Sequence, residues 1–192
     1  MTKGRLEAFS DGVLAIIITI MVLELHVPEE PTLAALGGSA TGFLTYLLSF
    51  VYIGIYWNNH HHMFHVVEHV DGTVLWANLH LLFWLSLVPF VTGWMGENHF
   101  APLPTAVYGA VLLLSGVAYL ILQSTIIARQ GPGSKLAAAV GKDVKGKLSA
   151  ALYVVAIPLA FFHEGISDAI YVLVALMWLV PDRRIESVLD RR

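Results

Sequence analysis

Six long apolar segments alternate with polar ones along the chain. The first runs from Gly12 to Leu23 without a charge, and the others cover residues 42–58, 74–95, 105–128, 148–162 and 166–180. A helix needs about 20 residues to cross about 30 Å of hydrocarbon. The last two segments have about 15 residues each. Helices of this length are accommodated where the bilayer thins locally or where neighbouring helices shield them. The pattern predicts an all-α integral membrane protein, with six transmembrane helices in a single domain over residues 1–192.

Prolines mark where these helices begin and bend. Pro102 and Pro104 open the fourth segment, where a residue without an N–H group is readily accepted. Pro89 and Pro158 fall inside the third and fifth segments. Because an internal proline removes a helical hydrogen bond, we expect kinks at these two positions.

The composition agrees with a membrane protein and excludes several other classes. Of the 192 residues, 57% are hydrophobic and 13% are charged, against about 45–50% and about 25% in soluble domains. Cysteine is absent, which excludes disulfides, thiolate catalysis and cysteine-ligated metal centres. We find no phosphate-binding loop and no catalytic motif. The sequence also has no basic patch interleaved with aromatic residues, so neither an enzyme nor a nucleic-acid partner is expected.

The basic residues predict the orientation in the membrane. All 11 Lys and Arg residues precede the first segment, separate the fourth from the fifth, or follow the sixth. Cytoplasmic loops carry such an excess of positive charge, so both termini are predicted to be cytoplasmic in a multi-pass protein of the cell (inner) membrane. The opposite loops carry only acidic charges: Glu29, Glu30, Glu97, Glu164 and Asp168.

One face of the first segment forms an apolar stripe. At 3.6 residues per turn, Ile16, Thr19, Ile20 and Leu23 share this face. Asp11 lies about 140° from Ile16 on a helical wheel, so it should point towards neighbouring helices. Periodicity alone leaves two interpretations, ordinary packing against another helix or the wall of a conduit.

The start of this helix carries polar residues that are costly in a membrane. Ser10 and Asp11 could cap the helix, whereas an Asp or Arg near the bilayer centre costs about 2.5–3.5 kcal/mol. The predicted topology brings these residues and Arg5 to the depth of the end of the second helix and the start of the third. We therefore expect a cytoplasmic-side polar cluster that locks the first three helices together. The candidate partners are Trp57, Asn58, Asn59, His60, His61, Asn78 and His80.

Nine histidines leave further functions open. His61 with His65, and His62 with His65 and His69, have spacings that suit metal ligation from a helix. His60 or His61 could pair with His80 to hold a haem. A metal or haem redox protein and a proton-coupled transporter are therefore alternatives to interfacial histidines that only form hydrogen bonds.

The motif Arg5-x-x-x-Phe9-Ser10-Asp11 resembles the lysosomal potassium-channel family, transmembrane protein 175, and specifically its bacterial members. The resemblance extends along the chain, although His62 stands where many members carry an arginine. The further matching elements are Trp57-x-x-His60-His61, Asn78 with Pro89-Phe90, and Pro181-Asp182-Arg183-Arg184.

The resemblance implies a potassium-selective cation channel, a homotetramer whose first helices line a central pore. By position, Ile16 would be the narrowest constriction, with Thr19 as a polar ring and Ile20 and Leu23 as further pore residues. Potassium and other monovalent cations would permeate without a cofactor, and proton permeation is also allowed because animal members pass protons. The residues that would hold the pore helix in place without touching ions are Arg5, Phe9, Ser10 and Asp11.

Overall fold

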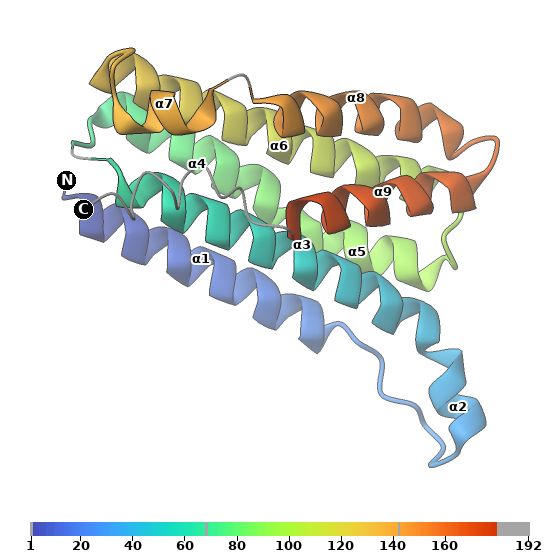
Figure 1. Cartoon of the computed structure of the whole chain (residues 1–192). Coiled ribbons are helices and arrows are strands. Elements are labelled where there is room, and N and C mark those ends of the chain that lie inside the picture. Colours follow the sequence, from blue (N-terminus) through green and yellow to red (C-terminus); the bar gives the residue numbers. More distant parts are fainter. Residues whose placement is uncertain (1, 68, 142, 180–192) are drawn as a thin grey trace.

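The computed structural model describes residues 2–67, 69–141 and 143–179, and within these ranges the chain forms nine helices (Figure 1). Six long segments run back and forth along the length of the molecule, close to the predicted apolar segments. The helices are α1 (Lys3–Leu23), α2 (Leu33–Gly38), α3 (Ala40–His65), α4 (Gly72–Ser86), α5 (Val88–Glu97), α6 (Pro102–Gln130), α7 (Lys135–Val140), α8 (Val144–Leu159) and α9 (Glu164–Leu179).

Four of these segments are long and apolar enough to cross a membrane. They are Lys3–Leu23, Ala40–His65, Gly72–Glu97 and Pro102–Gln130. The helices α8 and α9 have 16 residues each, as the shorter fifth and sixth apolar segments indicated. The motif at 181–184 and the four C-terminal arginines of the sequence lie outside the described residues.

The third apolar segment is divided into two helices. Helix α4 ends at Ser86 and α5 begins at Val88, with Pro89 in the first turn of α5. Proline has no N–H group to donate to the preceding turn, so the kink expected here takes the form of a helix break. Pro158, by contrast, lies one residue before the end of α8. Because α8 ends one residue later, Pro158 marks the end of this helix.

Helix α6 lies at the centre of the bundle and α1 at its edge (Figure 1). Helix α6 packs against α4, α5, α8 and α9, whereas α1 packs against α3, α4 and α5. One side of α1 is fully buried in this contact, through Leu6, Leu14, Ile17 and Met21. This arrangement leaves the opposite side of α1 outside the hydrophobic core.

A close approach between α6 and α9 depends on a glycine. A Cβ atom at Gly109 would overlap the side chain of Tyr171, which is fully buried. The Tyr171 hydroxyl donates a hydrogen bond to the carbonyl oxygen of Thr105 at 3.1 Å. The Tyr171 carbonyl in turn accepts one from the hydroxyl of Tyr52 at 2.6 Å. Buried hydroxyls must find partners, and here they join α3, α6 and α9.

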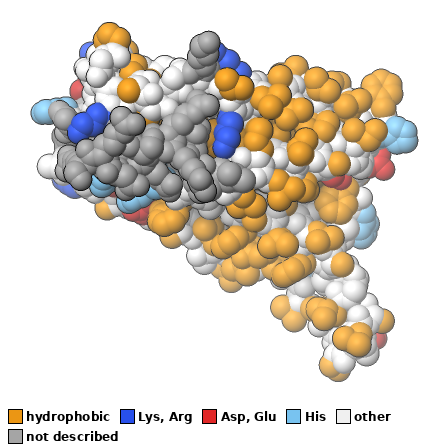
Figure 2. Space-filling view, viewed as in Figure 1, with side chains coloured by type: hydrophobic (Ala, Val, Ile, Leu, Met, Phe, Trp, Pro, Cys, Tyr) orange, Lys and Arg blue, Asp and Glu red, His pale blue; other side chains and the backbone are white. Residues whose placement is uncertain are grey.

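The basic side chains are not spread evenly over the bundle. On the face shown in Figure 2, Lys and Arg side chains lie in the half that holds the N-terminus, whereas acidic side chains and histidines lie at both ends. Apolar side chains cover much of the surface between the two ends (Figure 2). This distribution has the form expected of a helical bundle in a membrane.

Candidate functional site

The two sides of α1 differ sharply in burial. Ser10 lies on the buried side and is fully enclosed, while on the opposite side Ile16 is 60% exposed and Leu23 is 76% exposed. Ile20 and Thr19 are also exposed. The Thr19 hydroxyl donates to the carbonyl oxygen of Ala15 at 2.9 Å, so its donor is satisfied within the helix. The apolar stripe is therefore not packed against any helix in the described part of the chain.

A fully buried cluster of three polar side chains lies beneath the start of α1. We call Ser10, His60 and Asn78 the anchor cluster. Asn78 Nδ2 donates to Ser10 Oγ at 2.9 Å, and Asn78 Oδ1 lies 2.8 Å from His60 Nε2. Ser10 Oγ donates to the carbonyl oxygen of Leu6 at 2.9 Å. Because the Asn78 oxygen can only accept, His60 Nε2 must be the protonated ring nitrogen. The cluster joins α1, α3 and α4 with its hydrogen bonds satisfied.

Asp11 forms a separate contact at the surface. Trp57 Nε1 donates to Asp11 Oδ1 at 3.1 Å, and the Trp57 ring stacks on His61 with centroids 6.2 Å apart. Asp11, Trp57 and His61 are all exposed. Asp11 therefore contacts Trp57, one of its expected partners, but at the surface and not within a cluster buried between the first three helices. Asp11 follows Ser10 by about 100° around the helix, which takes it to the border of the buried side.

Three other expected members of the cluster make their contacts elsewhere. His80 is exposed and accepts a hydrogen bond from Trp84 Nε1, four residues later on α4, at 2.9 Å. It is two residues from Asn78, about 200° around the helix, and so faces away from α1. Arg5 is exposed, and its guanidinium group makes no hydrogen bond or ion pair with any described residue. Asn59 donates within α3, to the carbonyl oxygen of Ile55 at 2.8 Å.

The histidine run at the end of α3 does not assemble a metal site in the described part of the chain. The rings of His61 and His65 lie 6.3 Å apart between centroids, and those of His61 and His62 lie 5.7 Å apart. No group of three or more His, Asp or Glu side chains among the described residues has the geometry to hold a metal ion.

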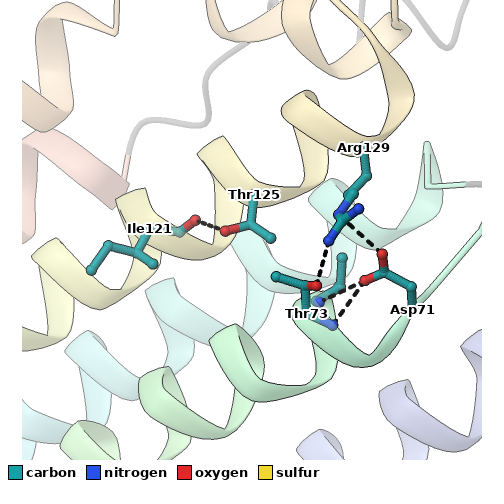
Figure 3. A network of polar contacts seen from close by, with 6 residues as sticks. Asp71, Thr73, Ile121, Thr125 and Arg129 are labelled. Carbon is teal, nitrogen blue, oxygen red and sulfur yellow. Dashed lines mark hydrogen bonds and ion pairs between the residues drawn. The ribbon is translucent and has the colours of Figure 1, made fainter.

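A contact that the sequence analysis missed joins α6 to α4 at the same end of the bundle (Figure 3). Asp71 Oδ1 accepts from the backbone N–H groups of Thr73 and Val74, at 2.9 and 3.0 Å, and so caps α4. Arg129 Nε lies 3.0 Å from Asp71 Oδ2, and the same guanidinium donates to Thr73 Oγ1 at 2.6 Å. The sequence indicated only that Arg129 is a topology-determining charge.

An open groove of about 960 Å³ lies at the other end of α1, bordered by the start of α3 and by α5. Glu24 and Glu97 line it, and His26 Nδ1 lies 4.0 Å from Glu97 Oε1. Carboxylates that line a concave surface raise the local concentration of cations. The apolar stripe of α1 thus ends beside an acidic groove.

Comparison with known proteins places this arrangement in one family. The family model described as endosomal/lysosomal potassium channel TMEM175 matches residues 5–89, which include the whole anchor cluster. A potassium channel of a Chryseobacterium species (strain P1-3) is 57% identical over 98% of both chains. The human endosomal/lysosomal proton channel TMEM175 is 35% identical over 96 residues, which are 43% of this chain and 19% of the human protein.

A solved structure has the same fold. The crystal structure of a lysosomal potassium-selective channel TMEM175 homolog from Chamaesiphon minutus superposes with a TM-score of 0.78. It is 30% identical in sequence, and the match covers 94% of this chain and 97% of that one. The chain described here belongs to the TMEM175 family.

Proposed function

We propose that this protein is a subunit of a potassium-selective channel in which α1 lines the pore. The observation that carries the proposal is the apolar stripe, which stays exposed while the other side of α1 is fixed in the bundle. Exposed apolar surface in such a continuous patch marks an interaction site with protein or lipid. Potassium conduction is supported by the names of the bacterial relative and of the homolog with the same fold.

In this proposal, copies of α1 surround a common axis with the stripe facing inward. Ile16 forms the narrowest ring, Thr19 a polar ring next to it, and Ile20 and Leu23 further pore-lining positions. Rings of branched apolar side chains exclude water unless the pore widens, and such constrictions gate by dewetting. Because the Thr19 hydroxyl hydrogen is bonded to Ala15, its oxygen is free to face a cation.

Residues at the start of α1 hold the pore wall in place. The anchor cluster fixes the buried side, and the contact between Asp11 and Trp57 fixes its border. Phe9 is 51% exposed within one subunit, and Arg5 is also exposed. We assign both to contacts with a neighbouring copy in a homotetramer.

We further propose six transmembrane segments in one domain over residues 1–192, with both termini on the cytoplasmic side of the cell membrane. The grouping of Lys and Arg side chains in one half of the bundle supports this orientation (Figure 2). Potassium and other monovalent cations are the permeant species, no cofactor or catalytic activity is involved, and the protein contacts lipid and copies of itself. Proton permeation is included because the human relative is named a proton channel.

The test is conduction by the purified protein in liposomes with opposed potassium and sodium gradients. We expect a reversal potential close to the potassium equilibrium potential for the wild type. Ile16→Asn should hydrate the constriction, raise the leak current and move the reversal potential towards zero. Val22→Asn, about 120° away from Ile16 on α1, is the matched control and should leave selectivity unchanged.

Two outcomes would contradict the proposal. Unchanged currents in Ile16→Asn would remove this residue from the pore. Saturable, pH-driven uptake without unitary currents would instead favour a proton-coupled transporter.

A further inference from the structure

A second site, distant from the apolar stripe, lies inside the subunit between α3, α6, α8 and α9. These helices border a partly open cavity of about 70 Å³. An apolar cavity of about 150 Å³ holds benzene, so this one has room for a smaller molecule. Five aromatic side chains contribute to its wall: Tyr52, Tyr56, Tyr119, Tyr153 and Trp178.

Hydrogen-bonding groups in the cavity are left without protein partners. Gln123 lines the cavity and is buried, yet its amide makes no hydrogen bond with any described residue. The Tyr56 hydroxyl likewise has no hydrogen-bond partner in the described ranges, and it faces Gly116, where an added Cβ would stand 3.7 Å from it. Buried polar groups are normally satisfied. Gln123 is such a group, and together with the partly buried Tyr56 hydroxyl it offers hydrogen bonds to a ligand that carries a polar head.

A carboxylate at one end of the cavity indicates that the polar head of the ligand is positively charged. Asp143 lines the cavity at the start of α8, and its Oδ1 accepts from the backbone N–H of Gly146 at 3.2 Å. No Lys, Arg or His in the described part of the chain forms an ion pair with it. At the same wall, Lys145 Nζ lies 5.8 Å from the centre of the Trp178 ring. An ammonium group is attracted by such a ring face, and the chain already uses this attraction here.

We propose that this cavity binds a small organic ammonium ion, its apolar body against the tyrosines and its charged head towards Asp143. Residues that line the cavity and residues that hold α1 in place lie on the same turns of α3. Tyr56 and Asn59 line the cavity, and Trp57 and His60, on a different face of these turns, contact Asp11 and Asn78. Occupancy therefore alters the support of α1 and modulates conduction. This second part rests on the proposed channel function.

The binding test uses the purified full-length protein and two small probes of nearly equal shape, ethylammonium and ethanol. Ligand binding to the folded state raises its thermal stability, so midpoint temperatures measured against probe concentration give each affinity. We expect ethylammonium to bind about tenfold more tightly than ethanol, as one ion pair of about 1.4 kcal/mol implies. Equal affinities for the two probes, or no binding of either, would overturn the proposal.

Two variants locate the site. Asp143→Asn keeps a good helix cap and should reduce the affinity for the ammonium to that for the alcohol. Asp71→Asn, the same change at the cap of α4, is the control and should leave both affinities unchanged. Gly116→Leu should fill the cavity and abolish the binding of both probes. Unchanged binding in Asp143→Asn or in a folded Gly116→Leu protein would place the site elsewhere.

Potassium flux separates modulation from binding. Saturating ethylammonium should change the flux through wild-type channels in liposomes and leave Asp143→Asn channels unaffected. Binding without a change in flux would refute the modulation. Binding to a protein that shows no potassium flux at all would leave the ammonium site standing and refute the channel function.

Discussion

Helices α1 and α6 are both long and apolar, but they use their surfaces differently. Helix α6 packs against four other helices and contributes twelve buried residues, whereas α1 contributes five, all on one side. An apolar sequence therefore does not tell whether a face is packed within the subunit. The difference teaches that α6 packs within the fold on several sides, while α1 is buried on one side and leaves the other exposed among the described residues.

The largest effect should follow from disturbing the packed helix. Gly109→Ala places a Cβ atom where the Tyr171 side chain lies. Overpacking typically costs about 1–3 kcal/mol. We expect the free energy of unfolding to fall by about 3 kcal/mol because the Tyr171 ring is fully buried. Thermal unfolding in detergent measures this loss of stability.

The matched control on the same helix is Gly116→Ala, since a Cβ atom at Gly116 meets only the Tyr56 hydroxyl, at 3.7 Å. The control should unfold near the wild-type temperature. If both variants unfold alike, the close approach of α6 and α9 does not limit stability.

Disturbing the anchor cluster should have the next largest effect. Asn78→Leu keeps much of the side-chain volume but leaves Ser10 and His60 without their shared partner. An unsatisfied buried polar group costs about 1–3 kcal/mol, so we expect a loss of about 2 kcal/mol in the free energy of unfolding.

The control for this variant is Asn98→Leu, because the Asn98 amide is exposed and donates only to the Trp94 carbonyl oxygen. Its stability should stay within about 0.5 kcal/mol of the wild type, as for most surface changes. A wild-type stability for Asn78→Leu would show that the cluster does not support α1.

The order of the helices could be predicted from the sequence, but the two short helices could not. The six long segments follow from apolar runs whose lengths suit a bilayer. Helices α2 and α7 have six residues each, too few to show a periodicity. Their caps, Thr32 and Ser134, accept hydrogen bonds from backbone N–H groups and were the only signal that could have found them.

The sequence predicted the depth of each site residue in the membrane, but not the direction in which its side chain points from the helix. The topology gave the height of each polar residue in the membrane, which was enough to group Ser10, Asn78 and His60. It did not give the angle around each helix relative to its neighbours, and so His80 was included although it faces away. The pairing of Asp71 with Arg129 depends on loop geometry that no periodicity encodes.

A smaller effect should follow at the border between the two sides of α1. Trp57→Phe keeps an aromatic ring but removes the donor to Asp11. A single hydrogen bond contributes about 0.5–1.5 kcal/mol, so the free energy of unfolding should fall by about 1 kcal/mol. If Asp11 only supports the helix, the reversal potential under opposed potassium and sodium gradients should not move. A shifted reversal potential with unchanged stability would place Asp11 in the ion pathway.

The smallest effect should come from the ion pair between α4 and α6. Asp71→Asn keeps an oxygen that can cap α4 and removes the charge that faces Arg129. Both side chains are about half exposed, and exposed ion pairs contribute about 0–1 kcal/mol. In low salt, we expect the free energy of unfolding of the wild type to exceed that of the variant by less than about 1 kcal/mol. The difference should disappear in about 1 M salt, where the screening length is about 3 Å. If it persists in high salt, the cap of α4 and not the charge accounts for it, and this end of the bundle is held by the same kind of satisfied hydrogen bond as the anchor cluster.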